Sequence, residues 1–228
     1  MKKLITYIIP ILLLLIVSCV ETPKERVLTM KDVFPTQKST DSILIISLDS
    51  IKHFSELENI VCDKESESKE FYFRNNNYDL KLYVREYTKC SSFGCVLIKE
   101  KNTLYVNYKS DSVSMGLLYN EKFTVKKYEK LLSKQFMNRG EKPNLSDLPH
   151  KVITFLTLVS SANDFEEEEI KLKSKLDTVS VAYFNFIESF KRTKKIDSLK
   201  KVYPLNLSIY IPIPPPPSSP PPIPIDIY

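Results

Sequence analysis

The spacing of the apolar residues changes partway along this 228-residue chain, and this change constrains the fold more than any other feature. Over residues 70–108, and most clearly over 78–84, apolar side chains alternate with polar ones, as in strands that bury one face. From Val125 onward they recur every three or four residues, as in helices. The sequence therefore predicts an α+β domain in which an antiparallel β-meander packs against several α-helices.

Short strands are expected mainly in the first half of the chain. The apolar or β-branched runs that predict them are 43–48, 71–73, 78–84, 96–98, 104–106 and 205–211. Asn75–Asn77 should join the second and third runs as a hairpin, because asparagine tolerates turn conformations. Residues 100–103 should join the fourth and fifth as another hairpin. The meander should continue through 116–119, and the last run should return to the sheet after the helices.

Helices are expected in five segments. They are 50–62, 125–140, 152–159, 164–192 and 196–202. Thr124 is a candidate cap of the second. The third is almost wholly apolar and follows Ser146-Asp147-Leu148-Pro149, a helix-start pattern, so it is expected to be the central helix of the core. Pro204 should end the last one.

The first nineteen residues have the pattern of an export signal. Lys2 and Lys3 precede fourteen apolar residues, Leu4–Val17, fewer than the about 20 that span a bilayer. Ile16-Val17-Ser18-Cys19 resembles the lipobox of bacterial lipoproteins. The resemblance implies signal-peptidase cleavage between Ser18 and Cys19, after the Cys19 thiol has been diacylated with palmitate-type chains. An uncleaved N-terminal membrane helix is the alternative.

The resemblance also implies a location. Acyl chains on Cys19 would hold the protein at the cell envelope, at about 0.8 kcal/mol per buried CH₂. Val20 stands where enteric lipoproteins that stay in the inner membrane carry aspartate, which implies the outer membrane, with the domain facing the periplasm or the cell surface.

The chain is expected to divide into four segments: signal peptide 1–18, lipidated cysteine and flexible tether 19–42, one globular domain 43–211, and proline-rich tail 212–228. Pro212–Pro224 holds nine prolines, which predict a disordered, semi-rigid polyproline arm of about 40 Å. The arm, Pro212–Tyr228, either presents its apolar tip to an envelope protein partner or has no target; both alternatives remain open.

Three cysteines remain once Cys19 is assigned to lipid: Cys62, Cys90 and Cys95. An exported chain can form disulfides, and Cys90 and Cys95 are spaced to close a small loop, so they are the predicted bridge. That all three stay reduced is equally open. No zinc site is expected, because no Cys-x-x-Cys pair is present and the only histidines are His53 and His150.

Several classes of function are excluded or left without support. The mature chain would carry 31 basic and 28 acidic residues, a net charge of +3, which gives no nucleic-acid footprint. Three glycines cannot build a glycine-rich phosphate loop. No serine-nucleophile, zinc-helix or calcium-loop motif is present, so no catalytic residue, metal or cofactor is predicted. Five tyrosines cluster on the meander: Tyr72, Tyr83, Tyr87, Tyr105 and Tyr108. They are expected to be mostly core, and an exposed face that binds a sugar, peptide or protein is the alternative.

The sequence thus favours a lipid-anchored envelope protein with a non-catalytic binding or assembly role, possessing an arm that reaches a partner. An exported hydrolase without a recognisable motif and an orphan structural lipoprotein are the alternatives. A hydrolase should have a deep pocket with converging polar groups near His53, His150 or paired carboxylates. A binding protein should have an exposed apolar or aromatic patch.

Overall fold

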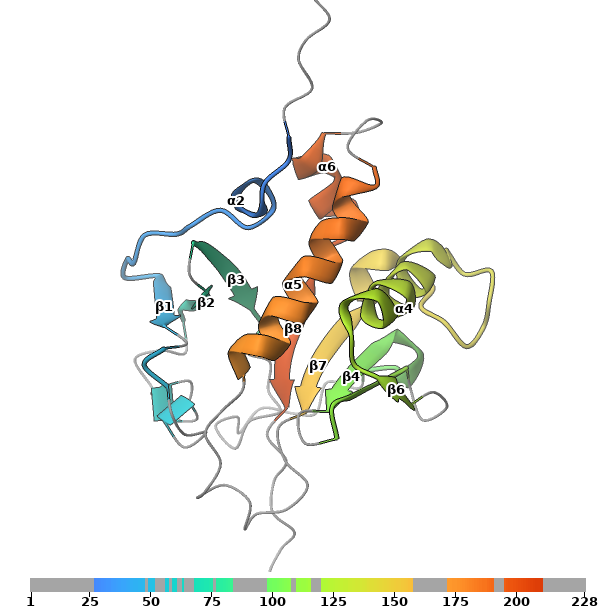
Figure 1. The fold of residues 1–228 in the computed structure, drawn as a ribbon, viewed down its shortest axis with the longest axis horizontal. Helices are drawn as coiled ribbons and strands as arrows, with labels where there is room; N and C mark the ends of the chain where they lie inside the picture. The colour runs from blue at the N-terminus through green and yellow to red at the C-terminus, as the bar shows by residue number, and fades with distance from the viewer. Residues whose placement is uncertain are drawn as a thin grey trace, which may run out of the picture.

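Eight strands form one mixed sheet in the order β1-β2-β3-β8-β7-β4-β5-β6 (Figure 1). The strands are β1 (Ile43–Ser47), β2 (Glu70–Asn75), β3 (Tyr78–Leu82), β4 (Thr103–Asn107), β5 (Ser112–Met115), β6 (Asn120–Lys122), β7 (Ile153–Thr157) and β8 (Asn206–Tyr210). At the centre, β3, β8, β7 and β4 run parallel. Antiparallel pairs flank them: β2 lies beside β3, β5 lies beside β4, and β6 lies beside β5.

The protein is described from a computed structural model. The residues it describes are 27–47, 49–51, 56–57, 59–60, 63, 68–75, 77–83, 98–107, 110–115, 120–157, 172–190 and 195–210. Helices in these ranges are α2 (Met30–Val33), α4 (Val125–Met137), α5 (Leu172–Glu188) and α6 (Ile196–Val202). None of the helices within these ranges has the length and apolar character needed to cross a bilayer.

The helices α4 and α5 pack side by side over one face of the sheet (Figure 1). Tyr128 of α4 makes a hydrogen bond to Thr154 of β7, so the Thr154 side chain lies on the sheet face that the helices cover. Register partners in neighbouring strands lie on the same face, so Leu104 and Leu207 also point toward the helices, where both are fully buried. The core therefore lies between this face and the helices.

Several sequence predictions are confirmed, and with them the α+β class. Residues 71–73 and 78–82 form the antiparallel β2–β3 hairpin, with Phe73 opposite Leu80. The helix after Thr124 is α4, and the Thr124 hydroxyl accepts a hydrogen bond from the Lys127 backbone N–H at 3.3 Å. The predicted helix 196–202 is α6, and the last strand is β8.

The predicted central helix 152–159 is wrong, because residues 153–157 form strand β7 in the middle of the sheet. A strand buried on both faces is apolar throughout, so it carries no alternation that distinguishes it from a short buried helix. The helix-start pattern before it forms only a 3₁₀ turn, η3 (Pro149–Lys151).

The predicted meander is correct only in part. Of the hairpin expected between 96–98 and 104–106, residues 96–97 lie outside the described residues, and the strand that holds 104–106, β4, pairs with β5 and β7. The turn expected between them is instead a 3₁₀ turn, η2 (Glu100–Asn102), that leads into β4. Strand β1, expected to be buried, is an edge strand parallel to β2, and Ile46 is its only buried residue.

Residues 27–42 of the predicted tether pack on the domain. Leu28, Val33 and Phe34 are buried in the core, and the Phe34 ring lies 5.7 Å from the ring of Tyr78 and 5.6 Å from that of Tyr183. These apolar residues are separated by polar ones without regular spacing, which is why the segment reads as a tether in the sequence. The domain therefore begins by Leu28 rather than Ile43.

Two predicted helices are described only in part. Of 164–192, residues 172–188 form α5 and residues 189–190 a turn; 164–171 and 191–192 lie outside the described residues. Of 50–62, residues 56, 57, 59 and 60 are helical, whereas 52–55, 58, 61 and 62 lie outside.

Candidate ligand-binding cavity

A cavity of about 600 Å³ lies on the sheet face that points away from α4 and α5, at the amino ends of β7 and β8. Tyr83 follows β3 and donates its backbone N–H to the Leu207 oxygen at 2.7 Å, which brings its side chain beside β8. The turns η2 and η3, which precede β4 and β7, contribute the rest of the lining. The parallel arrangement of β4, β7 and β8 therefore gathers residues that are far apart in the sequence.

The cavity has an apolar wall. Ile153 and Phe155 lie on the same side of β7, opposite to the core residues Thr154 and Leu156. The Phe155 ring stacks on that of Tyr105, with 5.6 Å between centroids and 19° between planes. Because this stack holds the Phe155 ring in place, the wall offers a fixed apolar surface.

Two polar atoms of the lining are buried without a hydrogen-bond partner among the described residues: Ser208 Oγ and Asn102 Oδ1. Ser208 is 2 % exposed and lies on β8 beside Phe155. A buried polar group without a partner costs about 1–3 kcal/mol, and nearly all such groups in proteins are paired. These two atoms are therefore the strongest indication that the cavity receives a ligand.

A third polar residue holds the cavity edge in place. The Asn206 amide donates from Nδ2 to the backbone oxygens of His150 and Val152, at 2.9 Å each. These bonds join the start of β8 to the turn η3, so the position of His150 and Lys151 is set by the backbone rather than by their own contacts. The charged edge of the cavity is thus partly preorganised.

Basic side chains surround the mouth. Lys99, His150 and Lys151 line the cavity, are exposed, and have no acidic residue beside them in the lining. The hydrogen bond from Lys101, at 2.5 Å, lowers the pKa of the nearby Asp147 carboxyl, and the charges of Lys101, Lys99 and Lys151 act in the same direction. The mouth is therefore electropositive and suits an anion.

The described residues show none of the usual arrangements for catalysis. They contain no group of three or more His, Cys, Asp and Glu side chains that could hold a metal ion. Ser208 Oγ has no hydrogen-bond partner among the described residues, so it makes no hydrogen bond to His150 in this structure. The described lining thus combines an apolar wall with two lysines and contains no serine that is hydrogen-bonded to a histidine.

Most site residues predicted from the sequence lie outside the described part of the chain. These are Ser18, Cys19, Cys90, Cys95 and the arm Pro212–Tyr228, together with Cys62 and His53. His150 is described and lines the cavity, whereas Lys99, Asn102, Lys151 and Ser208 were missed. The polar alternation of Asn206 and Ser208 on β8 was the one usable signal, since it marks a polar face on a central strand.

The prediction that the meander tyrosines are mostly core is wrong for those described. Tyr72, Tyr83 and Tyr105 are half-buried and do not belong to the core cluster, while Tyr87 and Tyr108 lie outside the described residues. The Lys81 ammonium lies 5.9 Å from the ring centroids of both Tyr72 and Tyr83.

Comparison with known proteins identifies no relative: no family model, no curated protein and no solved structure matches the chain.

Proposed function

We propose that this is a lipid-anchored protein of the cell envelope, held by acyl chains on Cys19 and facing the periplasm or the cell surface from the outer membrane. Its role is binding rather than catalysis. Its ligand site is the cavity at the amino ends of β7 and β8, and its ligand is a small molecule with an anionic group and an apolar body. The observation that carries this proposal is the lining, which combines an apolar wall, two unpartnered buried oxygens and three basic residues.

The charge of the cavity lining favours a negatively charged ligand. Among the described residues, Lys99, His150 and Lys151 line the cavity and no acidic side chain does, and the nearby Asp147 is paired with Lys101, so a cationic ligand would be repelled by two lysines. A hydrogen bond between a lysine and a carboxylate or phosphate contributes about 1.5–3 kcal/mol. One such bond accounts for roughly a tenfold preference for an acid over its neutral ester.

The apolar wall sets the second requirement. Ile153 and Phe155 give a ligand carbon chain a place out of water, at about 0.8 kcal/mol for each fully buried CH₂. A bare inorganic anion would leave this wall uncovered. Ser208 Oγ and Asn102 Oδ1 then discriminate within the class, because a ligand with a hydroxyl or amide beside its chain can bond to both.

A direct binding experiment tests the cavity. The mature chain with Cys19→Ala is titrated with dansyl-labelled undecanoic acid and with its methyl ester, and dansyl fluorescence reports binding. We expect saturable binding with the acid about tenfold tighter than the ester. Equal affinity for acid and ester, or no saturation with either, would contradict the proposed ligand class.

The anchor has its own test. Mass spectrometry of the protein extracted from membranes should find a chain that begins at Cys19 and carries acyl chains. The Cys19→Ala variant should show neither the acyl chains nor the cleavage, because cleavage follows diacylation in the order that the lipobox implies. A wild-type chain that still carries residues 1–18 would support the alternative of an uncleaved membrane helix.

The arm Pro212–Tyr228 is proposed to reach an envelope protein partner. Deleting it and repeating a crosslinked pull-down from membranes tests this directly. Loss of one crosslinked partner is expected, and an unchanged partner set would leave the arm without a target.

An exported hydrolase remains the second candidate, because Ser208 and His150 line the same cavity. The two hypotheses differ in turnover. The binding account expects no hydrolysis of a p-nitrophenyl ester above the rate in buffer. Turnover that is lost in both Ser208→Ala and His150→Ala would favour the hydrolase.

A further inference from the structure

We propose that the surface formed by α2 and α6 faces the bilayer and contacts anionic lipid headgroups. This surface, called the α2–α6 surface below, consists of Val27, Lys31, Lys195, Lys200, Lys201 and Val202. The inference rests on the proposed anchor at Cys19 and adds an orientation to it. Three observations carry it: the length of chain between the anchor and the domain, the charge of the surface, and the exposure of its two valines.

The tether is short because the domain begins early. Leu28, Val33 and Phe34 are buried, and the Gln37 backbone N–H donates to Asp79 Oδ2 at 2.6 Å, so the chain is fixed to the domain from Leu28 onward. Seven residues lie between Cys19 and Val27. The eight Cα-to-Cα steps from Cys19 to Val27 reach at most about 29 Å when fully extended.

That reach is small compared with the domain. Helix α5 alone has 17 residues, which corresponds to about 26 Å, and the sheet extends beyond it (Figure 1). The described chain starts beside α6 at one end of the molecule, and α2 contacts α6 directly. A lipid at Cys19 therefore brings this end, and not the opposite one, against the bilayer.

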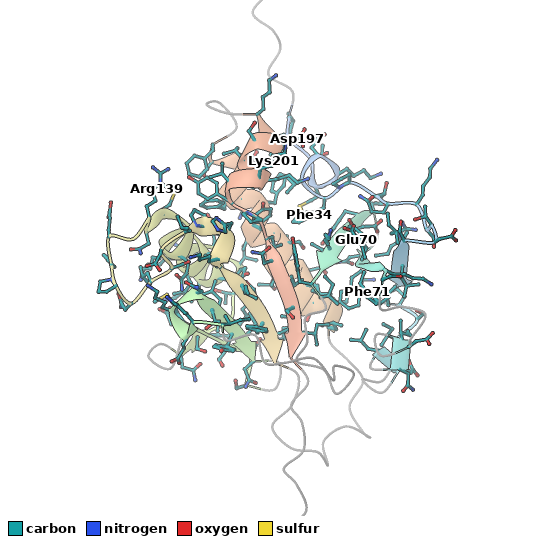
Figure 2. All side chains as sticks on the ribbon, turned by 180° about the vertical axis from the view of Figure 1, so that it is seen from behind. Phe34, Glu70, Phe71, Arg139, Asp197 and Lys201 are labelled. Atoms are coloured by element: carbon teal, nitrogen blue, oxygen red, sulfur yellow. The ribbon has the colours of Figure 1, made fainter. Side chains whose placement is uncertain are left out.

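The chemistry of this end fits an anionic lipid surface. Lys31, Lys195 and Lys201 are exposed and Lys200 is half-buried, and Figure 2 shows Lys201 beside Asp197 on α6, next to α2. Asp32 and Asp197 are the acidic residues of α2 and α6, so the net charge here is positive. The Asp32 carboxylate accepts hydrogen bonds from the Thr29 backbone N–H and hydroxyl. A lysine near an anionic bilayer strengthens binding by roughly fivefold.

Two exposed valines complete the surface. Val27 is 75 % exposed and Val202 is 44 % exposed, and both belong to the five large apolar residues that are exposed among those described. Apolar side chains flanked by lysines are typical of surfaces that lie in the headgroup region. The proposed arm follows β8, whose carboxyl end lies at the opposite end of the sheet (Figure 1). In this orientation the arm starts on the side away from the bilayer.

The absence of tryptophan from the chain makes a direct test available. Two single-tryptophan variants of the lipidated protein are compared: Val202→Trp on the α2–α6 surface and Val181→Trp on α5. The two valines are exposed to similar extents, 44 % and 37 %, so the control is matched. The proteins are placed in phosphatidylcholine–phosphatidylglycerol vesicles that contain brominated lipid, which quenches only nearby tryptophan.

We expect the Val202→Trp fluorescence to shift to the blue and to be quenched, and the Val181→Trp fluorescence to stay unchanged. Equal quenching of both, or stronger quenching of Val181→Trp, would overturn the orientation. Far-ultraviolet circular dichroism confirms that each variant is folded before it is compared.

Charge reversal tests the headgroup contact separately. In phosphatidylglycerol vesicles, Lys195→Glu/Lys201→Glu should weaken the headgroup contact by about tenfold or more. The weaker contact should appear as reduced quenching of the Val202→Trp fluorescence. The matched control, Lys122→Glu/Lys126→Glu, reverses the same number of charges on β6 and at the start of α4. If both pairs reduce quenching equally, the attraction is general and the α2–α6 surface is not the contact.

Failure of the anchor can be told apart from failure of this inference. If mass spectrometry finds Cys19 unmodified, the anchor proposal fails. The orientation test then continues with a hexahistidine tag in place of Cys19 on nickel-chelating lipid, which holds the chain at the same point.

Discussion

Arg74 and Asp79 form a two-bond ion pair across the β2–β3 hairpin, with 2.9 Å from Nε to Oδ1 and 2.8 Å from Nη2 to Oδ2. The Asp79 side chain is 0 % exposed. Its Oδ2 also accepts the Gln37 backbone N–H, and Arg74 Nη2 donates to the Gln37 oxygen at 2.9 Å. The pair therefore fastens the N-terminal segment to the sheet.

Asp79→Asn should destabilise the domain, because it removes a buried charge whose partners remain. We expect a loss of about 2–3 kcal/mol in the free energy of unfolding by urea, below the usual cost for a fully buried pair because Arg74 is partly exposed. Trypsin should also cut faster after Lys31 and Lys38, since Gln37 loses its partner. The control is Glu70→Gln, in the exposed Glu70–Lys81 pair, which should cost less than about 1 kcal/mol.

The hydrogen bond between Tyr128 and Thr154, at 2.6 Å, joins α4 to β7 inside the core. Thr154→Val should cost about 1–3 kcal/mol, because it leaves the Tyr128 hydroxyl buried without a partner. Tyr128→Phe/Thr154→Val removes both groups and should recover much of that loss in urea unfolding. A double variant no more stable than Thr154→Val would show that the bond does not determine the stability of this contact.

Alkaline pH should weaken the fold before it ionises the buried tyrosines. Burial raises the pKa of Tyr78 to about 12, and burial also raises the pKa of Tyr128 and Tyr183. The folded state therefore keeps protons that the unfolded state loses above about pH 10. The stabilisation is complete below pH 10 and is lost as the pH rises toward 12.

This dependence can be followed in two ways. The urea midpoint should fall between pH 10 and 12, and absorbance at the tyrosinate band should rise in step with unfolding. Tyr78→Phe should show a smaller fall over the same range. Ionisation of all tyrosines near pH 10 without unfolding would contradict the burial of these hydroxyls.

The Ser208→Ala variant should change the stability of the fold and the affinity for a ligand in opposite directions. Its Oγ is buried in the cavity lining without a hydrogen-bond partner, so Ser208→Ala removes an unsatisfied group from the empty protein. We expect urea unfolding to show an increase of up to about 1 kcal/mol in stability, with weaker binding of the dansyl acid. Destabilisation together with unchanged binding would mean that the hydroxyl has a structural partner and no role toward a ligand.

The regular patterns of the sequence were sufficient for some elements. The alternation at 78–82 and the spacing in α4 and α6 identify these elements, because each has its buried apolar side chains on one face. The strand β7 was missed because it is buried on both faces and has no alternation. The packed segment around Leu28 and Phe34 was missed because its anchoring depends on Asp79, about 45 residues away in the sequence.

The cavity was beyond prediction for a related reason. Tyr83, Asn102, His150 and Ser208 meet only because β3, β8, β7 and β4 are neighbours in the sheet. That order depends on long-range parallel pairing, which leaves no short motif. The sequence did contain the polar side of β8, but its central position in the sheet is a property of the fold.

The most direct test of the account is the effect of Lys99→Gln/Lys151→Gln on the ratio of the dissociation constants for the dansyl acid and its methyl ester. The account predicts that the ratio falls from about tenfold toward one, while the ester affinity stays within about twofold. Lys122→Gln/Lys126→Gln is the matched control and should leave the ratio unchanged. A ratio that persists in Lys99→Gln/Lys151→Gln would contradict the proposal that this cavity binds an anionic ligand through its basic mouth.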